Sequence, residues 1–427
     1  MTTRETIPVT ILGGSLGAGK TTLLNHLLTN AAGRDIAVLV NDMGEVNVDA
    51  ELVAAESELA VGGGVTELSN GCICCELQDD LETAVVRLAQ ERSFDHLVVE
   101  ASGVSEPGPV ARLFVTSRAA ARYDIAGLVT VVDSRLFADT FAGGDPDQTV
   151  AEDSDGEVRP LSDLLVEQVE SADLVVLNKC DLVSEEELAG VRDVVSALRP
   201  EADIVETTHS AVDIDTLLAD LYDPDAPVGW RAALETEAAE EEEEEEEHGH
   251  GHAHNGEAHD HEHGHSDDGH GHDHAVVSHA EETYGITSFV YRRRAPLDPE
   301  GLESVLGDLP SSVIRSKGTV WVGGADDVQY TYSQAGPSAY LTASGPWIAS
   351  LPEFEQDTYR RNHPEITWHD DYGDKRTELV FIGRDIDEDA LVAALDEHVL
   401  GDAGDVAQRF PTEPGAEVAL AEPEAGE

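Results

Sequence analysis

The first half of the chain alternates short apolar runs with segments whose apolar residues recur every three or four positions. The runs are Ile7 to Leu12, Ile36 to Val40, Leu97 to Val99, Leu128 to Val132 and Leu174 to Leu177. Continuous apolar runs of this length are typical of strands buried on both faces, and the intervening patterns are typical of helices. The sequence therefore predicts an α/β domain with a mostly parallel sheet covered by helices on both faces.

A second, smaller domain is predicted near the C-terminus. Its expected strands are Ile286 to Tyr291, Val313 to Val322, Val328 to Tyr332 and Glu378 to Ile382, with helical patterns near Leu302 and from Ala390 to Val399. This order favours an α+β unit with a largely antiparallel sheet. Arg315 and Lys317 are basic residues in an acidic chain, and they suit either a nucleotide or client contact or a stabilising ion pair.

The two predicted domains are separated by a segment of biased composition. Glu240 to Glu247 is an unbroken acidic run, and twelve histidines follow between His248 and His279. With almost no apolar side chains to bury, this segment is expected to be disordered, either as a low-affinity metal reservoir or as a solvated linker. We therefore expect a first domain at 1–225, a linker at 226–282, a C-terminal domain at 283–400 and a loose acidic tail at 401–427.

A phosphate-binding motif follows the first predicted strand. The stretch from Gly14 to Thr21 fits G-x-x-x-x-G-K-[ST] and leads into the helical spacing of Leu23, Leu24, Leu27 and Leu28. Glycines let backbone N–H groups surround a phosphate, and the helix adds its positive dipole end. Lys20 would reach the outer phosphates and Thr21 would bind Mg²⁺. The residues assigned to nucleotide binding here are Gly14, Gly17, Ala18, Gly19, Lys20, Thr21 and Thr22.

Other strand ends carry suitable chemistry, because ligands of such sheets gather at the carboxyl ends of the strands. Asp42 lies in the acidic segment 41–45 that follows the second run, where a nucleotide-sensing switch is expected. Glu100 directly follows the third run. It is suited to act on the Mg²⁺ shell or the attacking water, although a strand-capping acid is the simpler alternative. Gly103 would approach the γ-phosphate through its N–H.

The last predicted strand of the first domain is followed by Asn178-Lys179-Cys180-Asp181, the N-K-x-D arrangement of guanine-binding proteins. Asp181 would accept hydrogen bonds from guanine N1–H and the exocyclic amine, a donor pair that adenine lacks. The aliphatic stem of Lys179 would lie along the base. The sequence therefore predicts GTP rather than ATP as the nucleotide.

Three of the four cysteines fall within Gly71-Cys72-Ile73-Cys74-Cys75, directly before a predicted helix. This clustering is not a disulfide framework, whereas thiolates at a helix start suit zinc, cobalt or a related ion. Cys72, Cys74 and Cys75 leave a tetrahedral ion with one open position, filled by water, by Asp42 or Glu45, or by a partner's ligand.

Taken together, these motifs resemble those of the CobW-type family of P-loop GTPases. The resemblance covers the phosphate loop, 41–45, 67–75, 100–103 and 178–181, and extends through 313–318 and 378–383. It implies a slow GTPase with a CobW-like C-terminal domain, which binds a metal ion at the C-x-C-C sequence and delivers it to a client metalloprotein. A second copy of the chain, in a nucleotide-dependent homodimer, is a further candidate partner. Asp42 departs from the family, which more often has glutamate there.

Composition limits the partners. Lys and Arg number 25 against 88 Asp and Glu, a net charge of −63. Such a surface repels nucleic acid and anionic lipid, so we expect neither partner, and we interpret the charge as adaptation to a high-salt cytoplasm. Met1 to Glu5 lacks the apolar segment of a secretory signal and no apolar run approaches ~20 residues, so a soluble cytoplasmic protein is expected.

Two alternatives come from other functional classes. One is a metal-storage or regulatory protein whose nucleotide site does not switch, and the other is a small-molecule P-loop kinase. The N-K-x-D residues and the absence of an evident substrate domain disfavour the kinase.

Overall fold

The structure is a computed structural model, and it describes residues 6–31, 33–40, 65–67, 75–103, 107–141, 149–152, 158–224, 286–363, 366–401 and 406–421. Asp42, Cys72, Cys74 and the whole Glu/His-rich linker lie outside these residues, as does the side chain of Cys75. The predicted linker and the switch at 41–45 therefore stay predictions.

The first domain is built on seven parallel strands in the order β3-β2-β4-β1-β5-β8-β9. Their bounds are β1 (Ile7–Gly14), β2 (Ile36–Val40), β3 (Val65–Glu67), β4 (His96–Glu100), β5 (Tyr123–Asp133), β8 (Leu174–Asn178) and β9 (Asp203–Glu206). Every residue of β2, β4 and β8 is buried, which is why these segments read as continuous apolar runs. The predicted parallel α/β sheet is confirmed.

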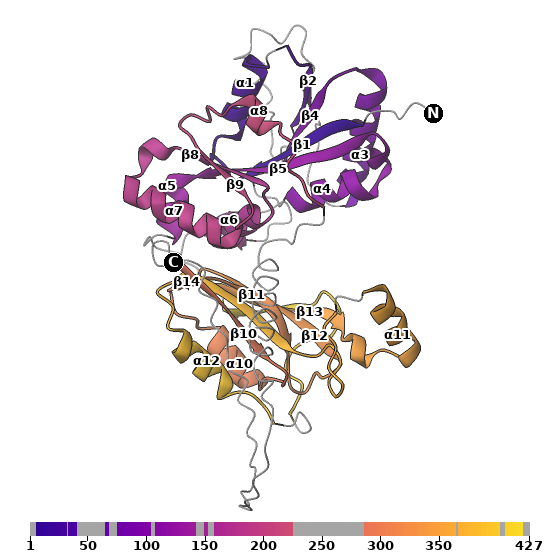
Figure 1. Cartoon of the computed structure of the whole chain (residues 1–427), viewed down its shortest axis with the longest axis vertical. Helices are drawn as coiled ribbons and strands as arrows, with labels where there is room; N and C mark the ends of the chain where they lie inside the picture. The colour runs from indigo at the N-terminus through magenta and orange to yellow at the C-terminus, as the bar shows by residue number, and fades with distance from the viewer. Residues whose placement is uncertain are drawn as a thin grey trace, which may run out of the picture.

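Helices cover both faces of this sheet (Figure 1). They are α1 (Lys20–Thr29), α3 (Cys75–Glu91), α4 (Pro107–Thr116), α5 (Ser134–Phe141), α6 (Leu161–Glu170), α7 (Glu185–Leu198) and α8 (Ile214–Leu217), with the 3-10 turns η1 (Arg118–Ala121) and η2 (Cys180–Leu182). Apolar residues of α1 and α8 pack on one face, and those of α3, α4 and α6 on the other. A short hairpin, β6 (Thr149–Glu152) and β7 (Val158–Pro160), precedes α6.

The C-terminal domain is a six-stranded antiparallel sheet in the order β10-β14-β11-β12-β13-β15. The strands are β10 (Ile286–Arg293), β11 (Val313–Trp321), β12 (Val328–Ala335), β13 (Ser338–Pro346), β14 (Thr377–Arg384) and β15 (Glu417–Ala421), with α10 (Pro299–Leu306), η3 (Ile348–Ser350), α11 (Glu353–Asn362) and α12 (Glu388–Asp396). The antiparallel α+β domain is as predicted. The expectation of a loose tail is wrong for residues 417–421, since they pair with β13 as its edge strand.

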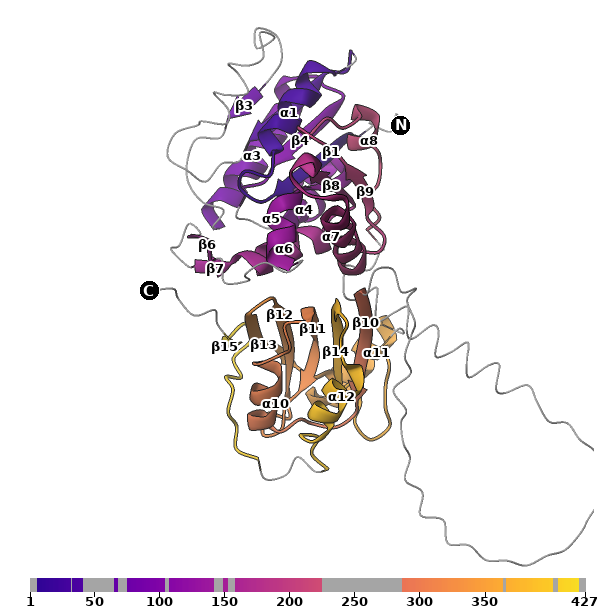
Figure 2. The ribbon, with the colours of Figure 1, turned by 90° about the vertical axis from the view of Figure 1, so that its left-hand side faces the viewer.

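The C-terminal sheet is buried on both faces. Along β14, Leu379 and Phe381 pack with α10 and α12, whereas Val380 and Ile382 pack with α5, α6 and α7 of the first domain. Figure 2 shows this arrangement, with the sheet between the first domain and the α10 and α12 layer. One continuous apolar cluster therefore joins the two domains. Among the described helices none is both long and apolar enough to cross a membrane.

Candidate functional site

The phosphate loop connects β1 to α1 at the carboxyl edge of the parallel sheet. Gly14 has φ +134°, and a Cβ there would lie 2.3 Å from the Val131 carbonyl oxygen of β5. Gly19, at the start of α1, has φ +113°, and its Cβ would lie 2.4 Å from Asn178 Nδ2. A residue with a Cβ could not adopt this path without displacing the main chain of Val131 or the side chain of Asn178. The backbone geometry therefore requires glycine at both positions.

Lys20 opens helix α1 and is only 7% exposed. Its Nζ donates to the carbonyl oxygens of Gly14 at 2.8 Å and Ser15 at 3.2 Å, so the ammonium group spans the loop. Thr21 is half-buried in the first turn beside it, Thr22 is exposed, and Ala18 is buried. Gly17 has φ +76° at the exposed tip of the loop, next to Leu16, which is 76% exposed.

Glu100 is the point at which three strand ends meet. It is buried at the end of β4 and stands in register with Leu12 of β1 and Val40 of β2. The next residue, Ala101, donates its N–H to the Leu12 carbonyl oxygen at 2.8 Å, which fixes the turn that follows. Glu100 therefore lies between the strand that leads into the phosphate loop and the strand after which the segment containing Asp42 begins.

Gly103 lies directly against the phosphate loop. A Cβ at this position would be 3.0 Å from Leu16 N and 3.1 Å from Lys20 Nζ. The absence of a side chain keeps the space beside the lysine ammonium open, as expected for a backbone group that approaches a terminal phosphate. Lys20, Glu100 and Gly103, which the sequence analysis singled out separately, are thus gathered at one end of the sheet.

Asn178 ties the base-recognition loop to the phosphate loop. It is 2% exposed, and its Nδ2 donates to the Ala18 carbonyl oxygen at 2.8 Å. Its Oδ1 accepts from the Ser210 N–H at 2.9 Å. Asn178 is thus a structural bridge, whereas Asp181, in η2 three residues further on, is exposed and able to accept hydrogen bonds from a base.

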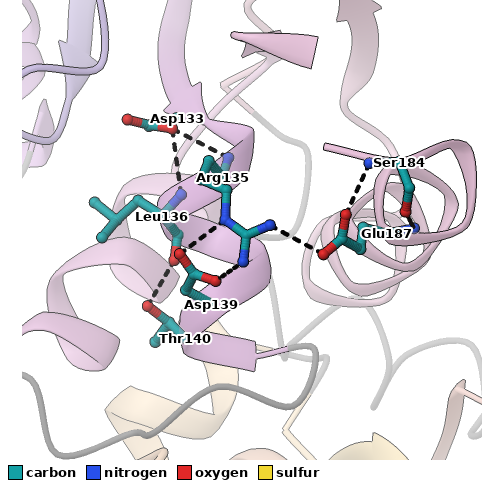
Figure 3. A network of polar contacts seen from close by, with 7 residues as sticks. All are labelled: Asp133, Arg135, Leu136, Asp139, Thr140, Ser184 and Glu187. Carbon is teal, nitrogen blue, oxygen red and sulfur yellow. Dashed lines mark hydrogen bonds and ion pairs between the residues drawn. The ribbon is translucent and has the colours of Figure 1, made fainter. Parts of the chain in front are cut away.

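Lys179 adopts φ 60° and donates from Nζ to Asp133 Oδ2 at 2.6 Å. Asp133 ends β5, and its other oxygen accepts the N–H groups of Arg135 and Leu136 at the start of α5 (Figure 3). Arg135 also bonds Glu187 of α7 at 3.0 Å, and Glu187 forms a capping box with Ser184. Hydrogen bonds from Ser184 lower the pKa of Glu187 most, and the hydrogen bond from Arg135 lowers it further. This network holds the two helices beside the base-side loop.

The sequence analysis missed one component of the base side. Ser210 donates from Oγ to the Gly19 carbonyl oxygen at 3.1 Å, in addition to its bond to Asn178, and both His209 and Ser210 have positive φ values. The loop follows β9, an edge strand whose residues are at best half-buried. An apolar-run criterion does not detect such a strand, so the loop behind it carried no signal.

The structure describes only one of the three predicted metal ligands, and that one only by its place in a helix. Cys72 and Cys74 lie outside the described residues, and Cys75 is described only as the first residue of α3. Within the described residues no group of three His, Cys, Asp or Glu side chains is placed to hold a metal ion. The remaining cysteine, Cys180, is half-buried and donates from Sγ to the Leu177 carbonyl oxygen at 3.1 Å.

The residues present fit a guanine nucleotide with Mg²⁺. The glycine cradle, the buried Lys20 and the helix N-terminus would receive the phosphates, and Thr21 would offer a hydroxyl to the ion. The loop around Asn178 and Asp181 would receive the base. Together with the seven-stranded parallel sheet, this arrangement defines a P-loop GTPase.

Comparison with known proteins extends the assignment to a family. The family described as "CobW/HypB/UreG, nucleotide-binding domain" matches residues 8–206, and "Cobalamin synthesis protein cobW C-terminal domain" matches residues 286–399. The chain therefore belongs to the CobW family, as its motifs predicted.

Several relatives are similar over much of the chain. The "Zinc-regulated GTPase metalloprotein activator 1" of Dictyostelium discoideum is 32% identical over 436 residues, which cover 93% of this chain and 81% of that protein. The "Zinc chaperone CobW" of Pseudomonas aeruginosa is 39% identical over 51% of this chain and 61% of that protein. Among solved structures, Zn(II)-bound YjiA GTPase from E. coli aligns with 92% of this chain and 99% of its own, at 20% identity and a TM-score of 0.37.

Proposed function

We propose that this protein is a GTP-hydrolysing metallochaperone that binds zinc, or a related divalent ion such as cobalt, through Cys72, Cys74 and Cys75 and delivers it to a client metalloprotein. The relatives named as zinc chaperones and as a metalloprotein activator support zinc as the ion. In this proposal the metal ion is cargo, and GTP with Mg²⁺ controls its affinity.

The observation that carries the proposal is the shared edge of the sheet. Glu67, the last residue of β3, is in register with Val40 of β2, and Val40 is in register with Glu100. Strand β3 thus ends at the edge of the sheet that carries the phosphate loop, and Cys72 follows five residues later in the sequence. In this proposal a change at the γ-phosphate is transmitted to the cysteine sequence through the ends of β4, β2 and β3.

The nucleotide-site residues have separate roles in this proposal. Lys20 binds the outer phosphates, Thr21 binds Mg²⁺, which neutralises developing charge, and Gly103 contacts the γ-phosphate. Glu100 orients the attacking water or the Mg²⁺ shell, and Asp42 contributes from the 41–45 switch. Asn178 and Lys179 hold the base pocket in shape, and Asp181 selects guanine.

GTP is proposed to order 41–45 and the cysteine sequence, which raises metal affinity, and hydrolysis releases the ion. Since coupling free energy is reciprocal, metal must tighten GTP binding by the same factor, commonly about 5–150-fold. A nucleotide-dependent homodimer, if formed, would appear as a doubled mass in light scattering with a GTP analogue and not with GDP.

The test is a Zn²⁺ titration of the full chain in high salt against a competing chelator, with Mg²⁺ and either a non-hydrolysable GTP analogue or GDP. We expect tighter Zn²⁺ binding with the analogue, abolished in Cys74→Ser and Cys75→Ser. Cys180→Ser is the matched control, because Cys180 is the one cysteine outside the cluster, and it should bind Zn²⁺ as the unmodified chain does. Equal Zn²⁺ affinity in both nucleotide states would refute the switch and favour a storage or regulatory protein.

A further inference from the structure

Helix α6 lies between the nucleotide site and the C-terminal domain. Of its residues all except Glu167 are buried, which is unusual for a helix on the outside of an α/β sheet. Leu165 and Val169 belong to the apolar cluster that also contains Ile314 and Val380 of the C-terminal sheet. The helix therefore has one side toward the parallel sheet and another toward the second domain.

On the nucleotide side, Gln168 connects α6 to the turn after β4. Its side-chain Nε2 donates to the Gly103 carbonyl oxygen at 3.5 Å, a long hydrogen bond, and its main-chain carbonyl oxygen accepts from Thr130 Oγ1 of β5 at 2.8 Å. Gly103 is the residue that lies against Lys20 and Leu16. The Gln168 amide thus restrains the glycine that the nucleotide site uses to approach the γ-phosphate.

On the opposite side, Arg315 of β11 holds the end of the same helix. Its Nε and Nη2 donate to the two carboxylate oxygens of Glu170 at 2.8 and 3.0 Å, and the side chains are 1% and 7% exposed. Arg315 Nη1 donates to Ser333 Oγ and the Gln334 carbonyl oxygen of β12 at 2.9 and 3.1 Å. A bidentate ion pair between a rigid guanidinium and a carboxylate fixes the relative orientation of the two groups as well as the distance between them.

The other end of the helix is held by the same sheet. Ser162 Oγ donates to the carbonyl oxygen of Ala335, the last residue of β12, at 2.9 Å. Both ends of α6 are therefore bound to the C-terminal domain. Well-packed apolar side chains often stabilise a buried interface at least as much as an ion pair does. We therefore explain the Arg315–Glu170 pair by the geometry that it imposes on α6.

We propose that Gln168 is a positioning residue for GTP hydrolysis, and that the Arg315–Glu170 ion pair holds the helix that carries it, so that the C-terminal domain sets the rate of turnover at the nucleotide site. This rests on the GTPase function and is independent of the cysteine site. In this proposal Gln168 acts through its bond to the Gly103 carbonyl oxygen. Its loss should therefore lower kcat while nucleotide affinity is preserved.

The first test replaces Gln168 by Met, which keeps length and removes the amide. In the full-length chain, Gln168→Met should lower kcat for GTP by about tenfold and change KM and GDP affinity by less than about twofold, in the range expected for residues that modulate a site indirectly. Gln356→Met is the matched control, since Gln356 Nε2 donates to the Ala349 and Leu351 carbonyl oxygens within the C-terminal domain. Its kcat should be unchanged.

The second test concerns the ion pair. Removing one partner alone leaves a buried charge and can unfold the chain, so Glu170→Met and Arg315→Met are combined. The double variant should fold, bind GDP normally and lose kcat to about the extent of Gln168→Met, and adding Gln168→Met should give little further loss, because interacting residues are not additive. If the two changes lower kcat independently, so that their losses multiply in the triple variant, the proposed link from the ion pair to Gln168 is refuted.

The outcomes separate this inference from the proposed function. A chain that hydrolyses GTP, with kcat unaltered by Gln168→Met, would overturn the positioning role and leave the GTPase standing. A fall in kcat accompanied by an equal fall in GDP affinity would also overturn it, because that result indicates general damage to the site. If the unmodified chain hydrolyses no GTP with any metal, both proposals fail together.

Discussion

The side-chain amide of Asn178 bonds the main chain of Ala18, 160 residues earlier in the chain, at 2.8 Å. The same amide accepts from the Ser210 N–H at 2.9 Å, so one buried side chain joins three loops around the candidate nucleotide site. A residue that reads as part of a base-recognition motif is therefore also the element that holds the base side and the phosphate side of the site in register.

Asn178→Ala is expected to weaken GTP and GDP binding equally, by about tenfold or more, because the loops lose their common support. It also leaves a buried carbonyl and a buried N–H without these partners, at about 1–3 kcal/mol each. Fluorescent-nucleotide titration and urea unfolding measure the two effects. Asn30→Ala, at the exposed C-cap of α1, is the control. An unchanged free energy of unfolding in Asn178→Ala would contradict this account.

Asp181→Asn tests guanine selection without disturbing the fold. Asp181 is exposed, so the free energy of unfolding should stay within about 0.5 kcal/mol of the original. The amide cannot accept from both guanine N1–H and the amine, so GTP affinity should fall by about a hundredfold, while xanthosine triphosphate, which carries an oxygen in place of the amine, should bind better. Competition titrations of both nucleotides give the ratio. Glu185→Gln, an exposed neighbour, should leave the ratio unaltered; if Asp181→Asn also leaves it unaltered, another residue selects the base.

Much of the fold is predictable because the central strands are buried on both faces and therefore appear as apolar runs. Strand β9 escapes this criterion because it lies at the edge of the sheet. The strand β13 has only the short apolar run Ala339 to Leu341, and its other residues are mostly small or polar. The phosphate loop is local in sequence, so its motif identifies it without knowledge of the fold.

The rest of the site depends on contacts that no local pattern encodes. Arg315 and Lys317 suited either a ligand contact or an ion pair, and the structure pairs Arg315 with Glu170, 145 residues earlier. Nothing in the sequence around Glu170 marks it as the partner, because acidic residues are common throughout the chain. Ser210 is likewise recognised only through the atoms that it contacts.

The net charge of −63 predicts a strong salt requirement. At about 0.01 M salt the Debye length is about 30 Å, so acidic groups repel across a whole domain, whereas at about 1 M it is about 3 Å. Near-UV circular dichroism should be lost on dialysis into low salt and regained on addition of KCl. Sucrose at matched osmolality is the control, since it adds no screening, and recovery of the signal with sucrose would argue against electrostatic repulsion as the cause.

His96 provides a test of pH-dependent stability within the parallel sheet. The imidazole is 5% exposed at the start of β4, and its Nε2 lies 2.8 Å from Thr10 Oγ1 of β1. Burial, and then the charge of Arg34, lower the pKa of His96 to about 4. An unfolded chain has a histidine pKa of about 6.5 and so binds a proton that the folded chain excludes between these values.

The contribution of His96 to the free energy of unfolding is accordingly fully present above about pH 6.5. It is lost as the pH falls toward about 4, by about 1.4 kcal/mol for each pH unit. Relative to His96→Gln, the unmodified chain should lose about 2 kcal/mol of unfolding free energy between about pH 7 and about pH 5. Urea unfolding of both proteins in high salt measures this difference. The carboxylates titrate alike in the two proteins, so their effect cancels when the two curves are subtracted. Parallel stability curves for the two proteins would mean that His96 titrates normally in the folded state.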